Sequence, residues 1–357
     1  MSSSILRALM TAGLLAAVSG LARGQVANAQ TETRAATQGL VREVAAVASA
    51  GGPAWVAYRV PIVAVRRRIC CGDSMSGGRC LLEGGGMVMD TGDERANGTR
   101  VALEPPASLL VFARIDAGGI TRVRTFTPDC DIDAGGMRLI WLTGVSPDES
   151  VAWLSTLVTS SSDSDERHER VAKPAIAALA LHNDGAADRA LDSFVAPARP
   201  EWMRADTTFW LGSTRGDSGV AVLRRLIASD SSDKVREKAV FGLSISRSSS
   251  ALPALIAAAK DDRNAHVRGQ ALFWLAHKAG EQAVAAISSA IASDPDTEVK
   301  KRAVFALSQL PKDEGVPKLI EVARTNGNAQ VRKQAMFWLG QSKDPRAIQF
   351  FEEILSR

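Results

Sequence analysis

Few residues of this 357-residue chain could do acid–base or metal chemistry. It has four histidines, and only one of them, His168, stands next to a carboxylate, Glu169. Histidine and glutamate can share a metal ion, but this pair falls in a polar stretch, Thr159–Glu169, that we expect to be a loop. Neither a nucleophile elbow nor a phosphate-binding glycine loop is present. We therefore predict that the chain has no catalytic set, binds no metal and needs no cofactor.

The cysteines point to disulfide chemistry. Adjacent Cys70 and Cys71 are poorly placed to bond each other, because a disulfide needs Cα atoms about 5.5 Å apart. We expect each of them to pair with one of Cys80 and Cys130, in either of two arrangements. A zinc site is the alternative, but the closely spaced cysteine pairs and the nearby histidine that zinc favours are missing.

A column of phenylalanines is our candidate for a binding surface. Two cations, Lys238 and Arg302, precede members of this column by three positions and so share a helical face with them. In one interpretation each ring packs sideways against the adjacent repeat. In the other, the column is a partly exposed aromatic ladder that holds an extended peptide, since aromatic and basic residues often dominate interfaces. The column recurs with a 32-residue period: Phe209, Phe241, Phe273, Phe305 and Phe337.

The same period runs through the apolar residues that must position this column. Val267, Ala271 and Leu275 stand at i, i+4 and i+8, which places them on one stripe of an α-helix. A second apolar stripe follows each of these helices, so each repeat is a helix pair. A fixed period of this length predicts a stacked solenoid. The leucine column is unbroken: Leu179, Leu211, Leu243, Leu275, Leu307 and Leu339.

Tryptophans alternate with small residues at one position of the repeat. Trp210, Trp274 and Trp338 follow one another at intervals of two repeats, and Gly242 and Ala306 stand between them. Alternating large and small residues favour interdigitated packing. We expect the tryptophans to fill the core between repeats, with a binding platform as the alternative.

The helix pairs resemble the HEAT repeat family from near Pro147 to Arg357. Asp262, then Val267-Arg268, Ala271 and Leu275 are similar to the family's "D…VR…A..AL" second helix. The resemblance implies that second helices line an inner surface that holds partners. The family includes enzymes of the oxidoreductase and lyase types, so a HEAT-like enzyme stays an alternative. It also implies a polar ladder between an acidic or amide column (Asp230, Asp262, Asp294, Asn326) and a basic column (Arg236, Arg268, Lys300, Arg332).

The first 29 residues are typical of an export leader. Arg7 precedes an apolar run, and Ala27-Asn28-Ala29 fits an A-x-A cleavage site that would leave Gln30 as the first residue. The apolar run is too short for a membrane anchor. We expect a periplasmic or secreted protein.

Residues 30–146 predict a small β-rich or α+β domain that the cysteines staple. The region 34–48 has a helical pattern, and four β-rich segments follow it. Asn97-Gly98, Asp116–Gly119 and Asp133–Gly136 are hairpin signals. The β-rich segments are 54–65, 108–115, 120–126 and 137–142.

We predict an exported scaffold without catalytic activity. The β-rich domain precedes an α-solenoid of about six HEAT-like pairs over residues 147–357, which holds a protein or peptide of the cell envelope. The modest net charge of +4 gives no reason to expect nucleic acid as a partner. No segment predicts membrane insertion. A HEAT-like enzyme and a purely structural envelope component are the alternatives.

Overall fold

The structure is a computed structural model. It describes residues 26–63, 69–70, 75–76, 79–83, 105–162, 166–278 and 281–356. The chain divides into two compact units, Met1–Ser146 and Pro147–Arg357. No described helix is long and apolar enough to cross a membrane.

The first unit is built on a five-stranded sheet with the strand order β2-β9-β3-β6-β7. Strands β3, β6 and β7 pair antiparallel, whereas β9 runs parallel to both β2 and β3. Helix α1 (Leu40–Ser49) contacts β3 and β6, and it buries Leu40, Val44 and Val47 at i, i+4 and i+7. The strands are β2 (Gln30–Ala35), β3 (Ala54–Pro61), β6 (Ser108–Asp116), β7 (Gly119–Phe126) and β9 (Arg138–Thr143).

A smaller sheet has the order β1-β8-β5-β4. Its strands are β1 (Val26–Ala27), β4 (Met75–Ser76), β5 (Arg79–Leu81) and β8 (Ile132–Asp133). A core of edge-to-face rings lies in this unit, where Phe112 contacts Trp55, Phe126 and Trp141. The prediction of a strand-rich domain is confirmed.

Two local predictions for this unit are wrong. The helix begins only at Leu40, because residues 30–35 pair with β9 as a strand. The turn Asp133–Gly136 does not close a hairpin, because β8 and β9 belong to different sheets. The turn Asp116–Gly119 does join the antiparallel pair β6 and β7. Asn97-Gly98 lies outside the described residues.

Strand β1 lies inside the segment predicted to be a leader. The carbonyl of Ala27 accepts a hydrogen bond from Ala134 N–H (2.9 Å), and Asn28 Nδ2 donates to Asp133 Oδ2 (2.7 Å). Cleavage after Ala29 would remove both bonds. The leader, its cleavage site and export stay predictions.

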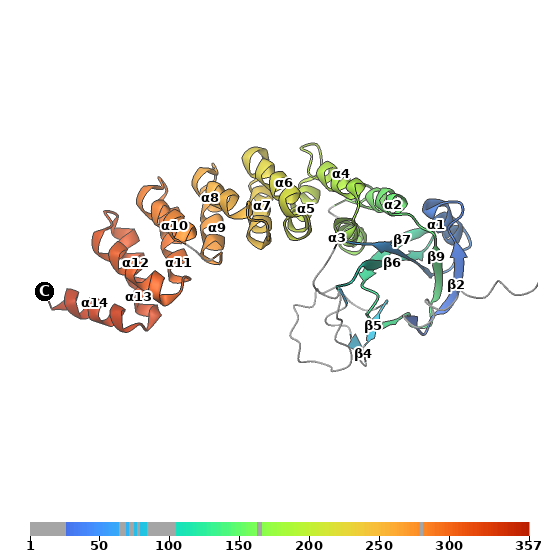
Figure 1. Cartoon of the computed structure of the whole chain (residues 1–357), viewed down its shortest axis with the longest axis horizontal. Helices are drawn as coiled ribbons and strands as arrows, with labels where there is room; N and C mark the ends of the chain where they lie inside the picture. Colours follow the sequence, from blue (N-terminus) through green and yellow to red (C-terminus); the bar gives the residue numbers. More distant parts are fainter. Residues whose placement is uncertain are drawn as a thin grey trace, which may run out of the picture. The chain divides into compact units, whose positions relative to one another are not determined.

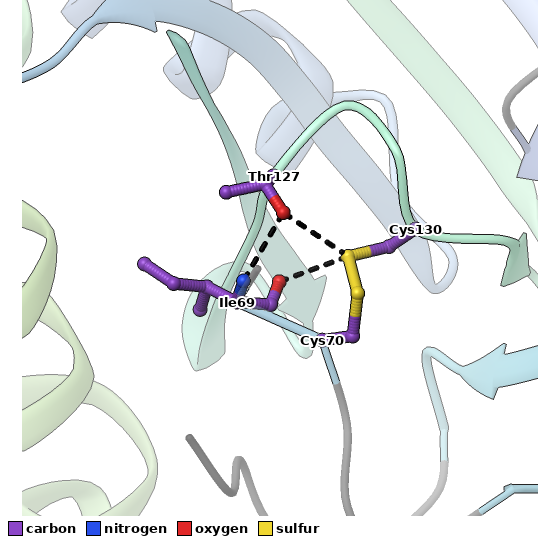
Figure 2. Close-up of a disulfide and its surroundings, with 4 residues drawn as sticks. All are labelled: Ile69, Cys70, Thr127 and Cys130. Carbon is purple, nitrogen blue, oxygen red and sulfur yellow. Dashed lines mark hydrogen bonds between the residues drawn. A yellow bond between two sulfur atoms is a disulfide. The ribbon is translucent and has the colours of Figure 1, made fainter. Parts of the chain in front are cut away.

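A disulfide joins Cys70 and Cys130 (Figure 2). Thr127 Oγ1 accepts a hydrogen bond from Ile69 N–H (3.1 Å), which holds the two segments together beside the bridge. Cys80 is also in a disulfide. Cys71 lies outside the described residues. The pairing of Cys70 with Cys130 is one of the two arrangements predicted.

The second unit is a row of helix pairs, as predicted. Consecutive second helices contact each other from α3 to α13, and first helices α6, α8 and α10 also contact their neighbours (Figure 1). The first helices are α2 (Pro147–Thr159), α4 (Gly185–Phe194), α6 (Gly216–Ser229), α8 (Ala251–Asp261), α10 (Glu281–Ser293) and α12 (Lys312–Thr325). The second helices are α3 (Lys173–Leu181), α5 (Glu201–Thr214), α7 (Asp233–Ile245), α9 (Ala265–Ala276), α11 (Thr297–Ser308) and α13 (Ala329–Ser342), and α14 (Pro345–Leu355) follows them.

The sequence sets where the second helices start. The leucine column is buried throughout, which fixes the face that each helix turns to its neighbours. The residue before each of four second helices accepts a hydrogen bond from a backbone N–H of the first turn, so the helix start is capped. The capping residues recur once in each repeat: Ser232, Asn264, Asp296 and Asn328.

Candidate functional site

Eight aromatic rings form one continuous row along α5, α7, α9, α11 and α13, which we call the aromatic row. Phe337 is 52% exposed, and the other seven rings are half-buried. Each ring contacts the next with a centroid distance between 4.9 and 6.2 Å. In order of contact, the row is Trp210, Phe209, Phe241, Trp274, Phe273, Phe305, Trp338 and Phe337.

The joints between second helices alternate along this row. Phe209 stacks on Phe241 at 6.2 Å with 21° between the rings. At the next joint, Phe241 meets Trp274 at 5.0 Å and 49°. The type of joint depends on the residue that stands at the tryptophan position. At Gly242 even a Cβ atom would lie 2.7 Å from Thr208 O. Helices α5 and α7 therefore approach too closely for a tryptophan at that position.

The tryptophans are not the buried core that the sequence predicts. Trp210, Trp274 and Trp338 are half-buried, and each lies against the phenylalanine of its own helix at 4.9 to 5.0 Å. Leucine and alanine fill the core instead. The periodicity alone could not show this, because Trp274 stands seven residues after the buried Val267 and so lies at nearly the same angle around the helix.

Both predicted cations lie on the same helices as the row. Lys238 is exposed on α7. Arg302 is half-buried, and it lies across Gly269 of α9, where a Cβ would come within 2.3 Å of Arg302 Cδ. Its Nη1 donates to His266 O at 3.4 Å. Arg302 therefore packs between α9 and α11 and also contributes a positive charge to the surface.

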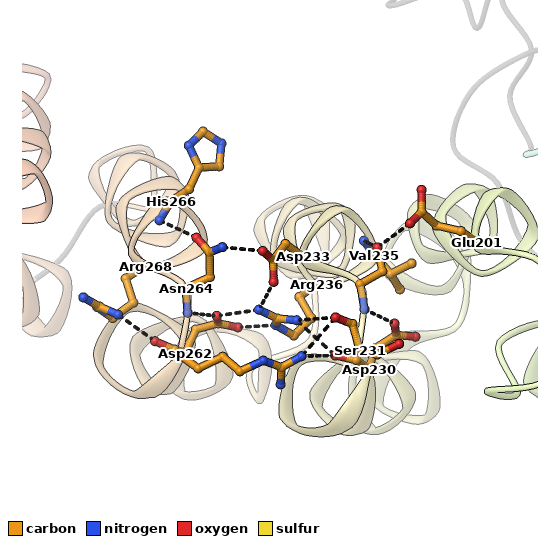
Figure 3. A network of polar contacts seen from close by, with 12 residues as sticks. Glu201, Asp230, Ser231, Asp233, Val235, Arg236, Asp262, Asn264, His266 and Arg268 are labelled. Atoms are coloured by element: carbon orange, nitrogen blue, oxygen red, sulfur yellow. Dashed lines mark hydrogen bonds and ion pairs between the residues drawn. The ribbon is translucent and has the colours of Figure 1, made fainter.

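A buried ladder of arginine and aspartate, the arginine–aspartate ladder, ties consecutive repeats (Figure 3). Arg236 Nε and Nη2 donate to Asp262 Oδ2 (2.9 Å) and Oδ1 (3.2 Å). Its Nη1 donates backward to Asp230 O at 3.0 Å. Such bidentate pairs fix both distance and direction. The three rungs are Arg204–Asp230, Arg236–Asp262 and Arg268–Asp294.

The ladder differs from the predicted columns at both ends. It starts at Arg204, which the predicted basic column omits although it stands one repeat before Arg236. It stops after Asp294, where Lys300 Nζ donates to Ala292 O (3.4 Å) instead of to the next repeat. Asn326, which replaces aspartate, carries no charge to pair with.

Within the ladder, hydrogen bonding to Asp294 raises the pKa of Arg268.

His168 is not in a loop. It begins a π-helical turn, η1 (His168–Ala172), and is buried. Its Nε2 lies 3.2 Å from Asp206 Oδ2, and its ring lies edge-on to Trp202 at 4.3 Å. Its neighbour Glu169 is 3.9 Å away and bonds Lys173 instead. The His168 imidazole and the Asp206 carboxylate therefore belong to a packing contact between η1 and α5.

His182 forms a second buried network. Its Nδ1 donates to Ala178 O (2.7 Å) and its Nε2 accepts from Ser150 Oγ (2.8 Å). Burial lowers the pKa of His182, so the imidazole is held neutral. Serine beside histidine can be a nucleophile and its base. Here both side chains are fully buried, so this pair joins α2 to α3 and offers no substrate an approach.

Within the described part of the chain, no three His, Cys, Asp or Glu side chains gather where they could hold a metal ion. The aromatic row, which extends over five second helices, is our candidate site. The sequence analysis did not include the tryptophans of the row or Arg204 among the site residues. Both could have been found from the repeat, because they recur at multiples of 32 residues.

Comparison with known proteins agrees with this architecture. A family model described as HEAT repeats matches residues 193–276 and 284–357. No protein of curated function matches the sequence. Human deoxyhypusine hydroxylase in complex with glycerol is 15% identical with a TM-score of 0.27, over 58% of this chain and 90% of that one.

Two further solved structures are similarly distant. The CpcE–CpcF complex of phycocyanin lyase from Nostoc sp. is 23% identical with a TM-score of 0.32, over 43% of this chain and 99% of that one. A complex of Kap95p with RanGDP is 15% identical with a TM-score of 0.37, over 59% and 32%. Likenesses this distant say nothing about what the chain binds or catalyses. The family match therefore shows that this chain contains HEAT repeats over residues 193–276 and 284–357, and the 32-residue period and the paired helices continue through the rest of its helical part.

Proposed function

We propose that the chain is an exported, non-catalytic scaffold whose aromatic row binds a protein or peptide of the cell envelope. The observation that carries this proposal is the continuity of the row. Rings from five successive second helices meet without interruption, and Phe337 stays 52% exposed. An apolar surface on a rigid frame loses little conformational entropy when a partner binds.

The row suits an extended segment better than a small molecule. Its rings are spread over five helices, and Lys238 supplies an exposed cation beside Phe241. A peptide with alternating apolar and acidic side chains matches such a surface. Aromatic rings of this kind commonly carry most of the binding energy of an interface.

Two features of the chain support export. A disulfide between Cys70 and Cys130 agrees with an oxidising compartment, and the leader-like start of the sequence agrees with secretion. Neither buried histidine network suggests catalysis, since Ser150 and His182 are sealed from solvent.

A site-specific photo-crosslinker tests the binding surface. A benzophenone side chain at Phe337 should give a discrete adduct with an envelope protein, and the variant Phe337→Ser should lose the partner while it keeps the wild-type melting temperature. Ile348 on α14 is the matched control, because it is 56% exposed but lies outside the row. Adducts of equal yield from both positions, or undiminished binding by Phe337→Ser, would refute the aromatic row as the binding surface.

A further inference from the structure

A cavity of about 210 Å³ lies beside Trp338, near the C-terminal end of the aromatic row. The end of α11, the first half of α12 and the end of α13 enclose it. Apolar side chains Leu307, Leu310, Val316 and Leu319 line it together with the indole. The Nε1 of Trp338 is buried and has no hydrogen-bond partner among the described residues.

The preceding unit of two repeats fills the equivalent place with its own lysine. Lys278 stands two repeats before Ser342, and Ser246 stands two repeats before Leu310. Lys278 Nζ donates to Ser246 O at 2.6 Å, so its alkyl stem and ammonium bridge the joint between α7 and α9. Burial lowers the pKa of Lys278, as expected for an ammonium taken partly out of water.

The first unit uses a cation from the next position of the repeat, since Arg215 stands one residue after Thr214, which is two repeats before Lys278. His182 stands two repeats before Ser246. Arg215 Nη2 donates to His182 O (3.0 Å) and to Leu179 O (3.1 Å). Two of the three joints are therefore closed by a cation that reaches back to the carbonyl groups after a second helix. At the third joint Ser342 stands in the register of Lys278 and the exposed Lys343 stands in that of Arg215, and no described side chain donates to Leu310 O.

We propose that this third pocket binds a lysine side chain supplied by a protein partner, which takes the place that Lys278 occupies in the preceding unit. Leu307, Val316 and Leu319 would contact the alkyl stem, and the Leu310 carbonyl would accept from the ammonium.

The electrostatics of the site agree with a cation. The pocket lies at the C-terminal end of α11, which has no basic residue in its last turn, and the helix dipole favours positive charge there. The Trp338 ring adds cation–π attraction. Lys312 at the rim opposes a second cation, and the neighbouring Asp313 and Glu314 in the first turn of α12 offset that charge. A peptide carbonyl beside the lysine can accept from the unused Trp338 Nε1.

This inference rests on the proposed function only in placing the pocket at the end of a peptide-binding row. Its test needs no partner protein. The full chain is titrated with three probes: Nα-acetyl-lysine methylamide, the same compound acetylated on Nε, and the norleucine analogue, which keeps the stem and lacks the amine. Binding is followed by the indole N–H resonance of Trp338, assigned with Trp338→Phe. We expect the lysine probe to bind at least tenfold more tightly than either analogue.

The chain supplies its own matched variants. Ser342→Lys rebuilds the internal contact seen at Lys278, so it should weaken probe binding at least tenfold without lowering the melting temperature. Gln349→Lys adds the same charge on α14 outside the pocket and should leave binding unchanged. Lys278→Ser should open a second probe site that the Trp274 indole reports.

Equal binding of the lysine and norleucine probes, or wild-type binding by Ser342→Lys, would overturn the lysine pocket. The outcome separates from that of the proposed function. If the crosslink at Phe337 forms but the lysine probe does not bind, the row stands and the pocket fails. If the probe binds but no crosslink forms, the pocket stands and the row fails as a partner surface.

Discussion

The joints between second helices from α5 to α11 differ from the joint between α11 and α13, although both follow the same 32-residue period. The earlier joints each carry a buried, bidentate arginine–aspartate pair. The last joint has Lys300 and Asn326 at those positions and no such pair. The cavity beside Trp338 and the most exposed ring, Phe337, both occur there. The period sets how helices stack, whereas a few joint residues decide which interfaces are closed.

The largest effect should come from breaking a rung of the ladder. Arg236→Ala would leave Asp262 buried without its partner, which we expect to reduce the free energy of unfolding by about 3–5 kcal/mol. Arg236 and Asp262 are almost completely buried, so solvent cannot compensate. Urea denaturation together with hydrogen exchange of α7 and α9 measures the loss.

Lys300→Ala is the matched change at the joint without a rung. Its ammonium makes one long contact of 3.4 Å at an exposed site, so we expect a loss below about 0.5 kcal/mol. Similar losses for the two variants would contradict the distinction between the joints.

Close helix approach gives the second effect. A Cβ at Gly212 would lie 2.1 Å from Gly242 O, so Gly212→Ala must push α5 away from α7 and should cost about 1–3 kcal/mol. Gly340 occupies the same column in α13 and has nothing within 4 Å. Gly340→Ala should therefore stabilise α13 by about 0.5–1 kcal/mol, because alanine is the better helix former. Thermal melts of the two variants that shift in the same direction would rule out this difference.

The sequence predicts the repeat unit well, because the fixed period brings back the same buried stripe in every helix pair. It predicts the joints less well. Gly242 and Trp274 occupy the same register, and only the distance between neighbouring backbones shows why one joint stacks Phe on Phe and the next places Phe against Trp.

The remaining differences between the sequence predictions and the structure depend on contacts between residues far apart in the chain. The strand Gln30–Ala35 exists because β9, at the other end of the first unit's sequence, pairs with it. The polar pattern of this strand gives no sign of that pairing. The burial of His168 depends on Trp202 and Asp206 of a later helix. For the candidate site, the sequence identified the phenylalanine column but could not show that tryptophans complete it.

A gain of stability should follow from transplanting a rung into the last joint. The double variant Lys300→Arg and Asn326→Asp recreates the pair found at Arg268 and Asp294, and we expect it to add about 1–2 kcal/mol, the range of charge-assisted hydrogen bonds. Hydrogen exchange of α11 and α13 reports the gain. Each single change should give little or no gain, because Lys300→Arg alone has no carboxylate to pair with and Asn326→Asp alone lacks the bidentate donor. A double variant no better than the sum of the two singles would mean that the joint lacks the geometry for a rung.

The smallest effect concerns acid and the polar contact that joins α2 to α3. Burial lowers the pKa of His182 below its ordinary value of 6.5, so the folded chain holds a neutral imidazole where the unfolded chain takes up a proton. The contribution of the neutral His182 to the free energy of unfolding is complete above about pH 6.5. It falls as the pH drops below that value, by no more than about 1.4 kcal/mol at pH 5.5. Arg215 beside the ring adds to this preference for the neutral form, and Asp184 opposes it. Urea denaturation between pH 7.5 and about 5.5 measures this slope. His182→Gln should lower stability at neutral pH and flatten the slope, whereas His277→Gln, at an exposed site, should leave the slope unchanged. If His182→Gln keeps the wild-type slope, the acid sensitivity belongs to another group, and the joint between α2 and α3 does not depend on a neutral histidine.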